Sequence, residues 1–135
     1  MSFRALLHAE LDRRRQVNRR YSLRAFARSL AVDHSTLSQI LRGKRRLTAR
    51  NVHAFGCRLR LTARDIEELA ALEYESAVLD AVGRPAFRPD SRWLASVTGI
   101  PLDAVNFTLQ RLLRKRKLTM ASRERWLRVE ERSRG

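Results

Sequence analysis

Apolar residues recur every three or four positions along most of the chain, which is the pattern of amphipathic helices. The first run predicts a helix over residues 3–17 that carries Phe3, Leu6, Leu7 and Leu11 on one face. Further helices are predicted at about 23–30, 34–42, 49–59 and 63–81. Each follows a residue type that caps helix N-termini, namely Ser22, Asp33, Thr48 and Thr62. The first 80 residues should therefore contain five helices.

The pattern changes after this region. Gly83, Pro85 and Pro89 fall within seven residues, so we place a domain boundary there and predict domains at 1–82 and 83–135. The second domain should contain helices at about 90–97 and 102–116, joined by a turn at 99–101. Segments 118–120 and 125–129 lack helical periodicity and predict a short β-hairpin. The expected fold class is mostly α.

The charge of the chain limits its partners. The net charge is +15, with a net of +7 in residues 1–80 (16 Lys/Arg, 9 Asp/Glu) and +8 in 81–135 (13 and 5). Such an excess repels itself unless a polyanion neutralises it, so nucleic acid is the first candidate and an anionic membrane surface the second. Arginine accounts for 26 of the 29 basic residues. Arginine suits phosphate and guanine, but a GC-rich genome would give the same bias.

Patterns of enzyme chemistry are missing from the sequence. The five glycines form neither a P-loop nor a GxGxxG motif. His8, His34 and His53 lack metal-ligand spacing, and Cys57, the single cysteine, is expected to be a buried apolar residue. We therefore expect no enzymatic activity, no metal and no cofactor. Without a signal-like or membrane-spanning segment, the expected location is the cytoplasm, at the nucleoid, with no membrane role.

The clearest functional pattern is SLRAFARSLAVDHSTLSQILRGKR, residues 22–45. A helix-turn-helix needs a small residue where its two helices meet, and Ala27 provides one. Apolar residues fall where the pair would face a core, at Phe26, Leu30, Val32, Leu37 and Ile40. Polar side chains that can reach base edges fall on the other face of the second helix, at His34, Ser35, Ser38 and Gln39.

With this motif and its five-helix order, the region of about residues 3–80 resembles the lambda-repressor-like (Cro/Xre-type) helix-turn-helix family. The resemblance implies that the four polar residues face the major groove, where Gln39 could pair with adenine. It also implies phosphate contacts from Ser22, Arg24, Arg28, Arg42, Lys44, Arg45 and Arg46. Family members usually carry Gly at the turn position held by Ala31. A left-handed backbone there costs Ala about 1–2 kcal/mol, so the turn is expected to differ slightly.

The segment RWLASVTGIPLDAVNFTLQRLLRKRKLTM, residues 92–120, resembles a second helix-turn-helix more weakly, with Ala95 and Gly99 at the small-residue and turn positions. With the hairpin, residues 86–130 resemble a small winged-helix unit. One interpretation is a second DNA contact through Asn106, Gln110, Arg111, Arg114, Lys115, Lys117, Arg123 and Arg125. The other is dimerisation or docking of a protein partner, since Leu102 and Phe107 could be exposed and Asp103 would repel phosphate.

These observations predict a transcription regulator, a dimeric repressor that binds double-stranded DNA sequence-specifically. A homodimer is expected because one short helix makes few base contacts, and its half-sites would lie about 34 Å apart. Two alternatives stay open. One is an antitoxin-like or adaptor protein whose C-terminal unit binds another protein. The other is a charge-driven, non-specific nucleic-acid binder, although such proteins often stack bases on aromatic residues, which are only 7% here.

Overall fold

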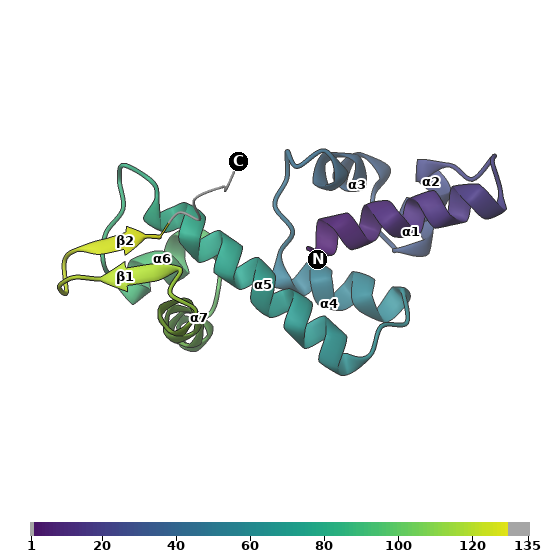
Figure 1. Ribbon diagram of the computed structural model, residues 1–135. Coiled ribbons are helices and arrows are strands. Elements are labelled where there is room, and N and C mark those ends of the chain that lie inside the picture. Colours follow the sequence, from purple (N-terminus) through teal and green to yellow (C-terminus); the bar gives the residue numbers. More distant parts are fainter. Residues whose placement is uncertain (1, 130–135) are drawn as a thin grey trace, which may run out of the picture. The chain divides into compact units, whose positions relative to one another are not determined.

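The computed structural model describes residues 2–129, which form seven helices and one two-stranded hairpin (Figure 1). The helices are α1 (Phe3–Val17), α2 (Leu23–Ser29), α3 (His34–Leu41), α4 (Ala49–Arg58), α5 (Ala63–Val82), α6 (Ser91–Thr98) and α7 (Leu102–Arg114). The strands are β1 (Leu118–Met120) and β2 (Trp126–Arg128), and they are antiparallel. The predicted mostly α fold with a C-terminal hairpin is confirmed.

The chain forms two compact units that divide between Glu73 and Tyr74, within α5. The sequence-based boundary at 82/83 falls instead at the end of this helix. The difference arises because α5 serves two cores. Leu69 and Ala70 pack in the first core, whereas Ala77 and Val78 are buried in the second. A single amphipathic helix gives no compositional signal at the point where its packing partners change.

The core of the first unit is built on α1. Phe3, Leu7 and Leu11 are spaced four residues apart, so they lie on one face of the helix and are buried. The Phe3 ring stacks on Phe55 of α4 with centroids 6.5 Å apart. The same cluster contains Phe26, Ala27 and Leu30 of the α2 region and Leu37, Ile40 and Leu41 of α3.

Cys57 corrects one sequence-based expectation, because its side chain is exposed and not buried. The helix α4 turns Val52, Phe55 and Gly56 toward the core. Cys57 follows directly after two buried positions, and the helical rotation of about 100° per residue carries it out of the apolar face.

An arginine-centred network joins α1 to α2. The Arg14 guanidinium donates to the Glu10 carboxylate (2.9 Å), to the Tyr21 hydroxyl (2.8 Å) and to Ser29 Oγ (3.1 Å). It also lies 5.2 Å from the centroid of the Phe26 ring. Hydrogen bonds from Arg13 and then Arg14 hold the pKa of Glu10 at about 2, against the opposing effect of partial burial. The network fixes α2 against the C-terminal half of α1.

The second unit packs α6, α7 and the hairpin around the C-terminal part of α5. Its fully buried side chains include Val78, Leu94, Val105, Leu112 and Leu118. The Phe87 ring contacts both Trp93 (5.7 Å between centroids) and Trp126 (5.6 Å). In the hairpin Leu118 pairs with Arg128 and Met120 with Trp126.

Two threonines, Thr98 in α6 and Thr108 in α7, place hydroxyl groups in the helices of the second unit. Their hydroxyls are satisfied within the helices, because Thr98 donates to the Leu94 carbonyl (2.6 Å) and Thr108 to the Ala104 carbonyl (2.7 Å). Thr108 can therefore be buried without an unpaired polar group.

The turn between α2 and α3 is a Schellman turn. The Val32 amide donates to the Ala27 carbonyl (3.0 Å) and the Ala31 amide to the Arg28 carbonyl (3.1 Å). Ala31 has a φ of 54°, so it adopts the left-handed conformation that favours glycine. The expectation that this turn would differ because of Ala31 is wrong. The two hydrogen bonds and the burial of Leu30, directly before Ala31, hold the strained residue in place.

The corresponding turn between α6 and α7 has Gly99 at this position, with a φ of 73°. The Gly99 amide donates to the Ala95 carbonyl (3.0 Å). A Cβ built on Gly99 would meet no atom within 4 Å. Conformation alone therefore determines the effect of a side chain there.

We predict that Ala31→Gly raises the free energy of unfolding by roughly 0.5–1 kcal/mol, because relief of left-handed strain exceeds the added entropy of the unfolded chain. Gly99→Ala is the converse variant and should lower it by about 1 kcal/mol. Urea unfolding monitored by circular dichroism measures both. A loss of stability in Ala31→Gly would contradict the left-handed assignment.

A second prediction concerns Glu10, whose pKa falls from 4.5 to about 2 on folding. A lowered carboxylate pKa stabilises the fold above the unfolded-state value, and this stabilisation is lost as the pH falls through the folded-state value. Glu10→Gln should therefore be less stable than the parent protein at neutral pH. The difference between the two should shrink as the pH decreases from about 4.5 to about 2. Gln16→Ala, at an exposed position of α1 without an ionisable group, is the control, and its stability difference from the parent protein should not change over this pH range.

Candidate nucleic-acid interface

The helix α3 presents one polar face to solvent. Asp33 begins the helix, with its carboxylate accepting from the Thr36 amide (3.2 Å). Leu37, Ile40 and Leu41 are buried in the first core. The four predicted base-contacting residues share the opposite face, where Ser38 is half-buried and the others are exposed: His34, Ser35, Ser38 and Gln39.

Two side chains of α1 hold the C-terminal end of α3. Arg4 Nε donates to the Ile40 carbonyl (3.1 Å), and His8 Nε2 donates to the Leu41 carbonyl (2.8 Å). The last carbonyls of a helix lack intrahelical partners, so these bonds both cap α3 and fix its orientation on α1. Sequence reasoning missed both residues. The available signal was their spacing of four positions, which places them side by side along the helix next to Phe3 and Leu7.

The basic loop after α3 folds back along that helix. Gly43 has a φ of 74°, and the Lys44 and Arg45 amides donate to the Gln39 carbonyl (2.9 and 3.2 Å). Arg45 Nη1 also donates to Thr36 Oγ1 (3.3 Å). Exposed cations therefore lie beside the polar face of α3, and the predicted base-contacting and phosphate-binding residues are adjacent here.

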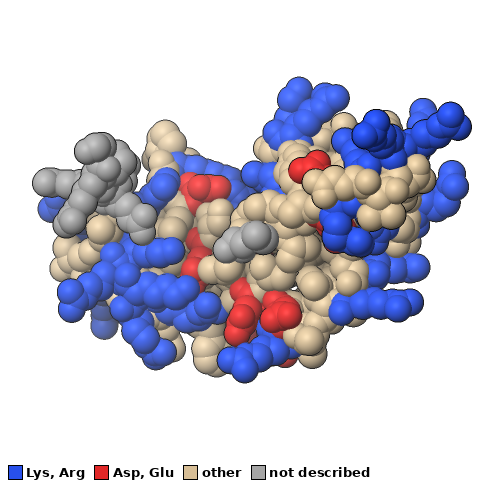
Figure 2. Space-filling model, turned by 45° about the vertical axis from the view of Figure 1, so that its right-hand side comes forward, with Lys and Arg blue, Asp and Glu red and all other residues tan. Residues whose placement is uncertain are grey.

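Positive charge dominates this part of the first unit. Residues 22–46 contain six basic residues and one acidic residue, Asp33, which is used as a helix cap. The six are exposed: Arg24, Arg28, Arg42, Lys44, Arg45 and Arg46. Figure 2 shows Lys and Arg side chains projecting from the first unit along the upper and right-hand edge of the view.

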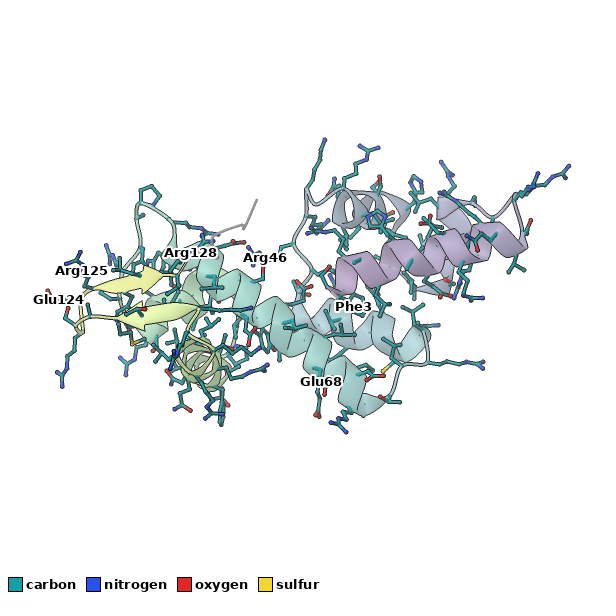
Figure 3. The ribbon with its side chains drawn as sticks, viewed as in Figure 1. Phe3, Arg46, Glu68, Glu124, Arg125 and Arg128 are labelled. Atoms are coloured by element: carbon teal, nitrogen blue, oxygen red, sulfur yellow. The ribbon has the colours of Figure 1, made fainter. Side chains whose placement is uncertain are left out.

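Besides Arg45, two of the predicted phosphate-binding residues are engaged within the protein. The Ser22 hydroxyl accepts from the Ala25 amide (3.0 Å), so it caps α2. Arg46, labelled in Figure 3, acts electrostatically on the half-buried Glu73 carboxyl. Burial raises the pKa of Glu73, and the charge of Arg4, the Phe3 amide and the charge of Arg46 oppose this rise.

In the second unit, two of the candidate DNA-contacting residues, Arg111 and Lys115, form ion pairs with a buried acid. The Glu75 carboxylate is 4% exposed and lies 2.8 Å from Lys115 Nζ and 3.3 Å from an Arg111 Nη. These ion pairs tie α7 to α5. Asn106, Gln110 and Arg114 remain exposed on the other face of α7.

The remaining candidates belong to the hairpin. Arg123 and Arg125 are exposed in the loop that joins the strands, and Figure 3 shows Arg125 at its tip beside Glu124. Lys117 is half-buried and lines an open pocket of about 210 Å³ together with Leu79, Arg128 and Val129.

Two other kinds of site are absent from residues 2–129. No group of three or more His, Cys, Asp or Glu side chains in this range is arranged to hold a metal ion. None of the helices described has the length and apolar composition needed to cross a membrane.

Comparison with protein-family models, with curated proteins and with solved structures gave no significant match for this chain.

Proposed function

We propose that this protein regulates transcription by binding double-stranded DNA sequence-specifically, with α3 as the recognition helix. The observation that carries the proposal is the exposed polar face of α3 with a basic loop held beside it by the Gln39 carbonyl. In this proposal α1–α5 form a lambda-repressor-like helix-turn-helix domain. The segment α6–α7 with its hairpin is a winged-helix-like unit.

Each part of this surface has a chemical role in the proposal. The α3 helix enters the major groove, which accepts a helix and presents a distinct donor and acceptor pattern for each base pair. The Gln39 amide can pair with adenine N6 and N7, and His34 and the two serines can donate to or accept from several bases. Lys44, Arg45 and the exposed arginines of α2 bind phosphates, which sets affinity and register but carries no sequence information.

The same surface argues for specific over purely charge-driven binding. A charge-driven binder needs only cations, and its affinity is independent of base identity. Here the polar face of α3 carries a histidine, a glutamine and two serines, one of them half-buried, and its single flanking acid is a cap. Short hydrogen-bonding side chains framed by cations are what base recognition requires.

The direct test is selection of bound duplexes from a random DNA pool at physiological salt, where counterion-driven background binding is weak. The proposal expects a reproducible sequence motif among the bound duplexes. Recovery of duplexes with no enriched sequence would overturn specific binding.

We predict that Ser38→Ala with Gln39→Ala lowers the preference for the selected sequence over random duplex by about tenfold to a hundredfold, since each good base contact contributes about 1–3 kcal/mol. Salt-sensitive background binding should be kept because the cations are unchanged. Gln16→Ala with Ser76→Ala removes the same two residue types from exposed positions of α1 and α5, and should leave the preference intact. Fluorescence anisotropy with both duplexes measures the ratio. An unchanged ratio in the α3 variant would show that α3 is not the recognition helix.

Neutralising the loop should have a different signature. We predict that Lys44→Gln with Arg45→Gln weakens binding to all duplexes alike. It should reduce the slope of log K against log salt by about 2, since each lost phosphate contact removes about 0.9. The matched control, Arg58→Gln with Arg60→Gln, removes the same charge from the end of α4 and should leave the slope unchanged. Equal changes in both variants would mean that net charge, and not this loop, governs affinity.

A further inference from the structure

The exposed face of α7 carries a stripe of four residues, Asp103, Phe107, Gln110 and Arg114, all of them exposed. Their spacing of four, three and four positions is that of a helix–helix contact seam. Phe107 lies in the middle of the helix and is 68% exposed. A large aromatic side chain with this exposure leaves apolar surface in water that a partner could cover.

The stripe is electrically neutral, although the chain has a net charge of +15. The two neighbouring cations, Arg111 and Lys115, are held by the buried Glu75 on the α5 side of α7. The side chains of Asp103 and Arg114 form no hydrogen bond or ion pair with other residues in the range 2–129. A carboxylate at the start of the stripe disfavours a phosphate backbone, so nucleic acid is a poor occupant of this face.

The order of the stripe makes it complementary to itself. It reads acidic, aromatic, polar, basic, and its spacing is the same in both directions. When a second copy of α7 lies antiparallel, Asp103 faces Arg114 of the second copy and Phe107 faces Gln110 of the second copy. The same contacts recur in reverse, which is the condition for a two-fold interface. The two charges lie about 16 Å apart along the axis, at a rise of about 1.5 Å per residue.

We propose that this stripe is the homodimer interface of the protein, and that a second copy of the chain covers it. Leu102 (41% exposed) and Leu113 (37% exposed) flank the stripe and add apolar area. One face of a 13-residue helix is small for a permanent interface, so association is in the micromolar range and depends on concentration. The proposal does not depend on DNA binding, and its test contains no DNA.

The test is a charge exchange measured by sedimentation equilibrium of the full chain at low salt. Asp103→Arg should weaken self-association by about tenfold or more, because two pairs of like charges then face each other. Arg114→Asp should do the same with opposite charges. The double variant exchanges the two charges within each chain, and it should recover self-association close to that of the parent protein.

Recovery of self-association by the double variant distinguishes a loss of charge pairing between the copies from damage to the fold. Asp103 in the first turn and Arg114 in the last turn both suit the helix dipole, so exchanging them weakens α7 itself. A structural effect would therefore make the double variant the worst of the three. Glu124→Arg, in the hairpin loop, makes the same charge change as Asp103→Arg off this face and should leave association unchanged. Circular dichroism establishes that each variant is folded.

Two outcomes would overturn the proposal. One is a parent protein that remains monomeric at the highest concentration reached. The other is a double variant that associates no better than the single variants. Phe107→Ser gives an independent check, since it should weaken association without changing charge. An unchanged association constant in Phe107→Ser would count against the proposal as well.

Discussion

The position of α3 depends on the tight turn that precedes it and on hydrogen bonds from α1 to its C-terminal end. At the start, Ala31 is held left-handed so that α3 can leave α2 abruptly and pack beside the small Ala27. At the end, Arg4 and His8 bind the last carbonyls of α3. The helix is thus fixed at both termini by groups outside itself, and burial of Leu37 and Ile40 fixes its rotation. With both ends and the rotation set, only one face of α3 remains available to a ligand.

Several acidic residues of this basic protein form hydrogen bonds or ion pairs within the fold. Glu10 organises Arg13 and Arg14, Asp33 begins α3, and Glu75 draws Arg111 and Lys115 against α5. Each of these acids holds secondary structure in place, and Glu10 and Glu75 also neutralise nearby cations. The exposed cations of residues 22–46 lie on α2, α3 and the loop that follows α3, while the exposed stripe of α7 is neutral. The chain is basic throughout, but its surface is not uniformly so.

The positions of the helices could be predicted from the sequence, because most helices follow a residue that caps their N-terminus and because their apolar residues recur every three or four positions. Ser22, Asp33 and Thr48 act as the predicted caps, and Phe26, Leu37 and Ile40 are buried as their spacing indicated. Other features could not be predicted from local pattern. The Arg4 and His8 bonds join residues more than 30 positions apart, and the exposure of Cys57 depends on the rotation of α4 against its neighbours. The pairing of Glu75 with Lys115 likewise requires knowing that α5 and α7 are adjacent.

The two units carry surfaces of different chemistry, and this difference bears on how the proposed regulator works. A recognition helix of eight residues contacts few base pairs, so specificity improves if two copies bind together. The face that joins the copies must then be separate from the face that binds DNA, and its charges must not repel those of the same face on the second copy. A strongly basic face fails the second condition, whereas the Asp103–Arg114 stripe meets both. A two-fold axis through this stripe would relate two copies of α3 by the same rotation, and that is the symmetry of an inverted-repeat DNA site.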